Sequence, residues 1–227
     1  IDTDNSGIDN EWFASPLPDA RPMPVPASYN DITTEPAVHD HVGWAWYQRM
    51  VDVPRLADGE RLILRFGSAS HEARVWVDDV EVATHVGGYL PFEADITEQA
   101  GRRFRLTVAV DNRLSWQTIP PGFVTTNELG REVQHYFHDF YNYAGLHRSV
   151  LLYTRPAIAV SDVTITTDLD GATGVVNYEV SLVESRPGED GSANVTVRVL
   201  DAAGNEVATG EGAEGRLRVE DANLWQP

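Results

Sequence analysis

The stretch ARVWVDDVEVATHV, residues 73–86, decides the fold class of this chain. Its apolar residues alternate with a period of two on both sides of Asp78-Asp79, a pattern typical of two antiparallel strands joined by a tight turn. Short alternating segments rich in β-branched and aromatic residues also lie on either side of it: residues 44–53, 61–66 and 104–110. This part of the chain has no sustained helical period, and one short helical turn is expected within residues 95–100. We therefore predict an antiparallel all-β domain, either a β-sandwich or a jelly roll.

The character of the chain changes near Pro156. Aromatic residues become rare, and alternating strands are predicted at residues 175–183, 195–200 and 206–209, with a tight hairpin connection at residues 202–205. This pattern is typical of an immunoglobulin-like β-sandwich. We divide the chain into two domains, residues 1–155 and 156–227, and expect the second to be truncated at its C-terminal end.

Composition excludes several classes of function. The chain has 227 residues with 17 basic and 35 acidic side chains, a net charge of -18 that opposes binding to nucleic acid and to anionic membranes. It has no cysteine, so disulfides, thiolate metal sites and a cysteine nucleophile are excluded. No apolar run approaches the ~20 residues that cross a bilayer. The first residues lack the pattern of a signal peptide, although a signal peptide already removed would leave the same start.

The segment YFHDFYNYAGLHR, residues 136–148, is the strongest candidate for a ligand site. Its aromatic residues bracket His138 and Asp139, so we expect this charged pair to lie among apolar rings with limited access to water. Two interpretations of Asp139 remain open. It caps a turn or pairs with Arg148 or a histidine, or it accepts hydrogen bonds from sugar hydroxyls while the rings cover apolar sugar faces.

Four residues form the predicted substrate-binding set: Asp139 first, then His138, Phe140 and Trp116. His138 and His147 also fit a structural role as hydrogen-bonding groups. A sugar-stacking platform could be formed by Trp44, Trp46, Trp76 and Trp116, of which Trp76 is assigned to the core and Trp116 to the site.

No catalytic residue, cofactor or metal site is predicted. His135, His138 and Asp139 have helical spacing, but the surrounding sequence is not a helix pattern. His39 and His41 alternate as ligands on a strand do, yet nothing nearby completes a set. Asn127-Glu128 matches a glycosidase acid/base pair in two residues only and lies in a polar turn.

Seven stretches resemble glycoside hydrolase family 2, in particular its bacterial β-glucuronidase branch. They are VPASYND (25–31), WYQR (46–49), VWVDDVEV (75–82), GGYLPFEADIT (87–97), NRLSWQTIPPG (112–122), YFHDFYNYAGLHRSV (136–150) and LYTRP (152–156). The resemblance implies a galactose-binding-like jelly roll followed by an immunoglobulin-like domain. In the family a catalytic (β/α)8 barrel follows and carries both catalytic glutamates. It also implies a bacterial, cytoplasmic protein that assembles as a homo-oligomer, a homotetramer in the family.

The function that the resemblance implies is the non-catalytic part of a retaining β-glucuronidase that hydrolyses β-D-glucuronosides. Asp139 matches the family's aspartate that reaches into the barrel and contacts the glycone hydroxyls. A retaining mechanism needs two carboxyl groups about 5–5.5 Å apart, and we identify no such pair here, so we expect this chain to be inactive alone. The alternatives are a free carbohydrate-binding module and a purely structural interaction domain.

The ends of the chain depart from the family pattern. The family's opening strand before Gly7 and its closing strand after Pro227 have no counterpart here. We therefore expect independent folding of the first domain only.

Overall fold

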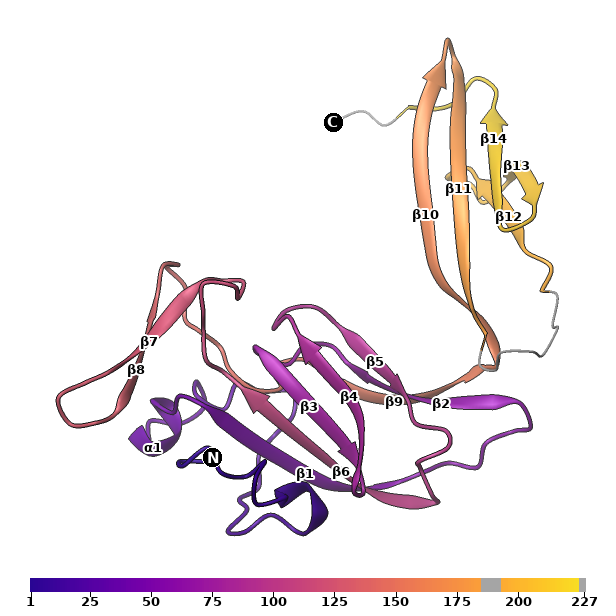
Figure 1. The fold of residues 1–227 in the computed structure, drawn as a ribbon. Helices are drawn as coiled ribbons and strands as arrows, with labels where there is room; N and C mark the ends of the chain where they lie inside the picture. Colours follow the sequence, from indigo (N-terminus) through magenta and orange to yellow (C-terminus); the bar gives the residue numbers. More distant parts are fainter. Residues whose placement is uncertain (185–192, 225–227) are drawn as a thin grey trace. The chain divides into compact units, whose positions relative to one another are not determined.

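The computed structural model describes residues 1–184 and 193–224, and the described residues form an all-β protein, as predicted (Figure 1). The chain divides into two compact units, Ile1–Thr154 and Arg155–Pro227. The sequence places the boundary after residue 155. Each unit has its own core and is described separately.

Unit 1 is a sandwich of two antiparallel sheets. The larger sheet has the order β1-β6-β3-β4 and the smaller sheet the order β5-β2-β9. The strands are β1 (Trp44–Asp52), β2 (Glu60–Phe66), β3 (Glu72–Val77), β4 (Val80–Val86), β5 (Phe92–Asp95), β6 (Arg103–Asp111) and β9 (Val150–Pro156). The predicted segments 44–53, 61–66, 73–86 and 104–110 are all confirmed as strands. Asp78-Asp79 forms the predicted turn, and Asp78 has the left-handed backbone (φ 50°) that such turns require.

The main core of unit 1 lies between the two sheets. Every second residue of the facing strands is buried there because side chains alternate across a strand. This set includes Leu62, Leu64 and Phe66 of β2, Val75 and Val77 of β3, and Phe104, Val108 and Val110 of β6. Trp76 is 1% exposed but points to the opposite face of β3, so it belongs to a second core.

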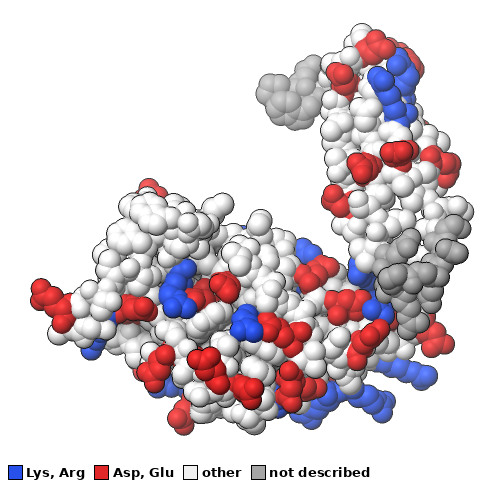
Figure 2. Space-filling view, viewed as in Figure 1, with Lys and Arg blue, Asp and Glu red and all other residues white. Residues whose placement is uncertain are grey.

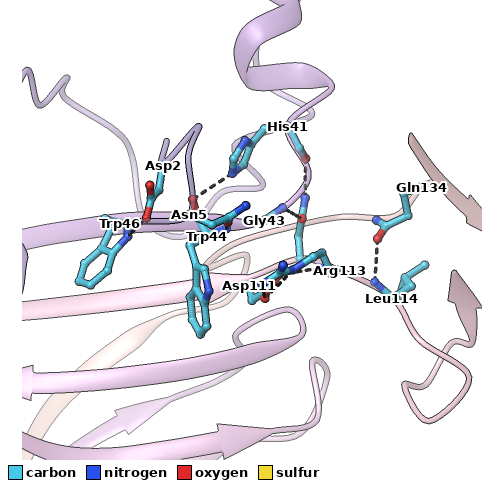
Figure 3. A network of polar contacts seen from close by, with 11 residues as sticks. Asp2, Asn5, His41, Gly43, Trp44, Trp46, Asp111, Arg113, Leu114 and Gln134 are labelled. Carbon is cyan, nitrogen blue, oxygen red and sulfur yellow. Dashed lines mark hydrogen bonds and ion pairs between the residues drawn. The ribbon is translucent and has the colours of Figure 1, made fainter. Parts of the chain in front are cut away.

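The second core covers the outer face of the larger sheet. Trp76 stacks on Trp46 at 5.5 Å between ring centroids and on Phe13 of η1 (Trp12–Ala14) at 4.9 Å. The buried Asp2 carboxylate accepts a hydrogen bond from Trp46 Nε1 (Figure 3). It also accepts one from the backbone N–H of Gly7. The first residues of the chain are therefore part of the packing of the sheet.

Two parts of unit 1 differ from the sequence expectations. His39 ends a short helix, α1 (Pro36–His39), so the strand-like spacing of His39 and His41 is not that of a strand. An unanticipated hairpin pairs β7 (Gly122–Thr126) with β8 (Glu132–Tyr136). Its turn is the predicted polar one, where Asn127 Oδ1 accepts two backbone N–H groups.

Unit 2 has two sheets facing one small core, as predicted for an immunoglobulin-like pattern. β10 (Ile158–Asp170), β11 (Thr173–Glu184) and β14 (Glu214–Val219) form one sheet, and β12 (Thr196–Leu200) pairs with β13 (Glu206–Glu211). The core contains Tyr178, Val180 and Leu217. β10 pairs only with β11 among the described strands, and its Val163, Ile165 and Leu169 are exposed. The predicted truncated end, residues 225–227, lies outside the described residues.

In the part of the chain that the structure describes, no helix has the length and hydrophobicity needed to span a membrane.

The contribution of the second core to stability can be tested by replacing Trp76. We expect Trp76→Ala to lower the free energy of unfolding of unit 1 by about 3–5 kcal/mol, because the cavity lies in a fully buried site. Val80→Ala, at an exposed position of the same hairpin, should change it by less than about 1 kcal/mol. Urea denaturation followed by tryptophan fluorescence measures both, and equal effects would contradict this packing.

Candidate functional site

The predicted site segment leaves the end of β8 and keeps the alternation of a strand beyond it. The His138 ring lies between two aromatic rings: it stacks on Tyr136 at 4.6 Å and contacts the tilted ring of Phe140 at 4.0 Å between ring centroids. Residues 137–140 form a bend, which we call the Asp139 loop. Three rings from alternate positions therefore form one side of this loop.

A second group of rings includes Phe137. Phe137 lies 5.2 Å from Trp116, and Trp116 lies 6.1 Å from Phe123, which stacks on His135 across the hairpin. Trp116 is 68% exposed. In Figure 2, the upper part of hairpin β7–β8 is largely free of charged side chains, whereas acidic groups gather along the lower part of unit 1. The upper part of the hairpin thus carries fewer charged side chains than the lower part of unit 1.

The tryptophans do not form the sugar-stacking platform that was considered. Trp46 and Trp76 are buried in the second core, while Trp116 is exposed beside the hairpin. Trp116 is therefore the one of these three that a ligand could reach.

The expectation that Asp139 has limited access to water was wrong. The side chain is exposed, and it forms no hydrogen bond or ion pair with the described residues. Arg148 instead donates to the carbonyl of Tyr89. The rings contact one another rather than cover the carboxylate, so within the described chain Asp139 neither caps a turn nor pairs with Arg148 or a histidine.

His138 does not act as a structural hydrogen-bonding group in this structure. Both of its ring nitrogens are buried, and neither has a hydrogen-bond partner among the described residues. The imidazole is held by stacking alone. His147, for which the same structural role was expected, does have a polar contact, because its Nδ1 lies 3.2 Å from Ser70 Oγ. Burial, followed by the charge of Arg148, lowers the pKa of His147.

The residues that anchor the chain after the Asp139 loop were not predicted from the sequence. His71 Nε2 donates to Asn142 Oδ1 at 3.0 Å, and burial is the main cause of the lowered pKa of His71. Ser28 and Asn30 bond the backbone of residues 142–144. The only available signal was that residues 25–31 resemble the same family as residues 136–150.

The geometry does not bring a metal-ligating set together. His135 lies on strand β8 and bonds Thr125 Oγ1 through Nε2, at 2.8 Å. No three His, Asp or Glu side chains converge as metal ligands anywhere in residues 1–184 and 193–224. What the loop offers is one exposed carboxylate beside accessible aromatic rings. Such a group can accept hydrogen bonds from hydroxyls while rings contact apolar faces.

The chain was compared with known families and proteins. Residues 1–156 match the model of the sugar binding domain of glycosyl hydrolases family 2. A β-glucuronidase of Paenibacillus borealis is 51% identical over the whole chain, which covers 38% of that protein. The solved β-glucuronidase of an uncultured Clostridium species is 42% identical with a TM-score of 0.85. The match covers 98% of this chain and 37% of that one.

A third similar structure carries a ligand. It is a Ruminococcus gnavus β-glucuronidase in complex with D-glucuronic acid, 35% identical, with a TM-score of 0.86 over 100% of this chain and 38% of that chain. The chain thus spans less than two-fifths of the length of these relatives.

Two substitutions of His138 can show whether its ring contacts or its nitrogens contribute to stability. We expect His138→Phe to keep the ring stack and to leave the free energy of unfolding equal or higher, because removing a buried unsatisfied polar group costs nothing. His138→Ala should lower it by about 1–3 kcal/mol through loss of two ring contacts. Thermal and urea unfolding compare them. Equal destabilisation of the two variants would contradict this view. It would show that the ring nitrogens of His138 form a hydrogen bond that contributes to stability.

Proposed function

Since the chain belongs to glycosyl hydrolases family 2, we propose that it is the non-catalytic N-terminal part of a retaining β-glucuronidase that hydrolyses β-D-glucuronosides. The similar proteins described above are β-glucuronidases more than twice its length, and one of them binds D-glucuronic acid. In this proposal the chain supplies a contact to the glycone and surfaces that support the rest of the enzyme.

The exposed, unpaired state of Asp139 in the described chain is the observation that carries the proposal. Its carboxylate is exposed, has no partner among the described residues and lies in a loop flanked by aromatic rings. A carboxylate held in this state keeps all of its acceptor capacity for a ligand. Sugar hydroxyls are donors of the required kind, so we assign Asp139 the contact to the glycone hydroxyls. His138, Phe140 and Trp116 complete the proposed binding set.

The chemistry of bond cleavage is proposed to lie outside this chain. Retaining hydrolysis requires an acid/base and a nucleophile whose carboxyl groups are about 5–5.5 Å apart. We assign both groups to a catalytic barrel of the longer protein and expect the 227-residue chain alone to be inactive. Assembly as a homo-oligomer and a cytoplasmic location in a bacterium are parts of the same proposal.

A free carbohydrate-binding module is the second candidate. The exposed ring of Trp116, with Phe137 beside it, favours this reading because exposed aromatic rings contact apolar sugar faces. A single carboxylate without an opposite wall provides few polar contacts, so we favour the first candidate.

Substitution of Asp139 tests the main proposal in the full-length protein. We expect Asp139→Ala to lower kcat/KM by about 10- to 150-fold, which corresponds to loss of a hydrogen bond to a charged group worth about 1.5–3 kcal/mol. Its stability should be unchanged because Asp139 has no bonded neighbour in the described chain. Asp162→Ala, an exposed carboxylate on β10, serves as the control. Unchanged kinetics of Asp139→Ala would refute the assignment.

Calorimetric titration separates the two candidates. The 227-residue chain should show no binding of glucuronic acid at micromolar concentrations if it supplies only part of a pocket. Micromolar affinity would favour the free binding module instead.

A further inference from the structure

The backbone that follows the Asp139 loop is held by side chains from residues more than 100 positions earlier. The N–H of Ala144 donates to both Ser28 Oγ and Asn30 Oδ1, at 3.0 Å each. Asn30 Nδ2 donates to the carbonyl of Asn142 at 3.0 Å. Ser28 Oγ in turn donates to Asn30 Oδ1 at 2.6 Å. We call Ser28 and Asn30, with these four bonds, the clamp.

The clamp is part of the interior. Ser28 is 7% exposed and Asn30 is 6% exposed, and the Asn142 and Ala144 groups that they bond are also buried. Water is therefore a poor substitute partner, and removal of either side chain leaves buried backbone groups unsatisfied. The clamp thus fixes residues 142–144 more strongly than surface hydrogen bonds would.

Two neighbouring bonds extend this attachment toward Asp139. Tyr141 donates its hydroxyl to the carbonyl of Asn30 at 2.6 Å, and Asn142 accepts from His71 Nε2. By contrast, the side chains of the Asp139 loop itself contact their surroundings through ring stacking. Stacked rings restrict position less strictly than directional hydrogen bonds do. The hydrogen-bonded anchor nearest to Asp139 along the chain therefore begins two residues after it, at Tyr141.

We infer that Ser28 and Asn30 are positioning residues for Asp139: they set where its carboxylate meets the substrate without touching the substrate themselves. This inference rests on the proposed function of Asp139. A displacement of about 1 Å at a binding group can reduce rate on the order of 100-fold, so loss of the clamp should impair activity through Asp139.

Asn112 provides a matched control. It is also a buried asparagine, 2% exposed, and its side chain bonds two backbone groups: Oδ1 accepts from Gly43 N–H and Nδ2 donates to the His41 carbonyl, both at 2.8 Å. Figure 3 shows His41 and Gly43 in this network. Asn112 holds residues 41–43 rather than residues 141–144. Asn30→Ala and Asn112→Ala therefore remove similar bonds from different loops.

The test is a double-mutant cycle in the full-length protein. We expect Asn30→Ala to lower kcat/KM about 10- to 100-fold at a temperature where it remains folded. Asn112→Ala should lose similar thermal stability and keep kcat/KM within about twofold. In an Asp139→Ala background, Asn30→Ala should cause no further loss, because its effect passes through the missing carboxylate.

Each outcome has one meaning. If Asp139→Ala alone leaves kcat/KM unchanged, the proposed function of Asp139 is wrong. If Asp139→Ala lowers kcat/KM but the effect of Asn30→Ala is simply additive with it, or equals that of Asn112→Ala, the positioning role is wrong and the proposed function stands.

A second measurement needs no activity. In the 227-residue chain, Asn30→Ala should accelerate amide hydrogen exchange in peptides that cover residues 137–146, whereas Asn112→Ala should accelerate it at residues 41–43. Unchanged exchange at residues 137–146 in Asn30→Ala would show that the clamp does not hold the loop.

Discussion

Burial of both faces of the larger sheet in unit 1 is the constraint on which the rest of the structure depends. Val75 and Trp76 are neighbours on β3, point in opposite directions, and are both buried. A strand buried on both faces cannot shift its register without exposing one apolar set. The turns at its ends therefore have fixed positions. His71, which directly precedes β3, uses this fixed position to bond Asn142 and so connects the sheet to the candidate site.

Much of the fold could be predicted because the period-two alternation is a local property of the chain. The β3–β4 hairpin and strands β1, β2 and β6 follow from adjacent residues alone. The clamp could not be predicted in this way, since Ser28 and Ala144 are 116 positions apart and neither has an unusual sequence environment. Hairpin β7–β8 was missed because its strands are mostly polar and exposed.

The candidate site, too, could be predicted only in part from adjacent residues. Composition directed attention to residues 136–148, and the shielded Asp139 that it implied was wrong. Alternation places the rings of Tyr136, His138 and Phe140 against one another, and composition does not reveal that rings pack together instead of over a carboxylate. By contrast, the assignment of Trp76 to the core is confirmed, and its ring is interior because Phe13 and Trp46 stack on it.

The exposed apolar side chains of β10 have a consequence for the behaviour of the chain in solution. An edge strand with Val163, Ile165 and Leu169 accessible is a template for intermolecular pairing. At low ionic strength the net charge of -18 keeps molecules apart. Salt at about 0.1 M shortens the range of this repulsion to roughly 10 Å. The tendency of the 227-residue chain to associate is therefore set by two opposing effects: repulsion between its negative charges and intermolecular pairing at β10. The salt concentration of the buffer changes the first.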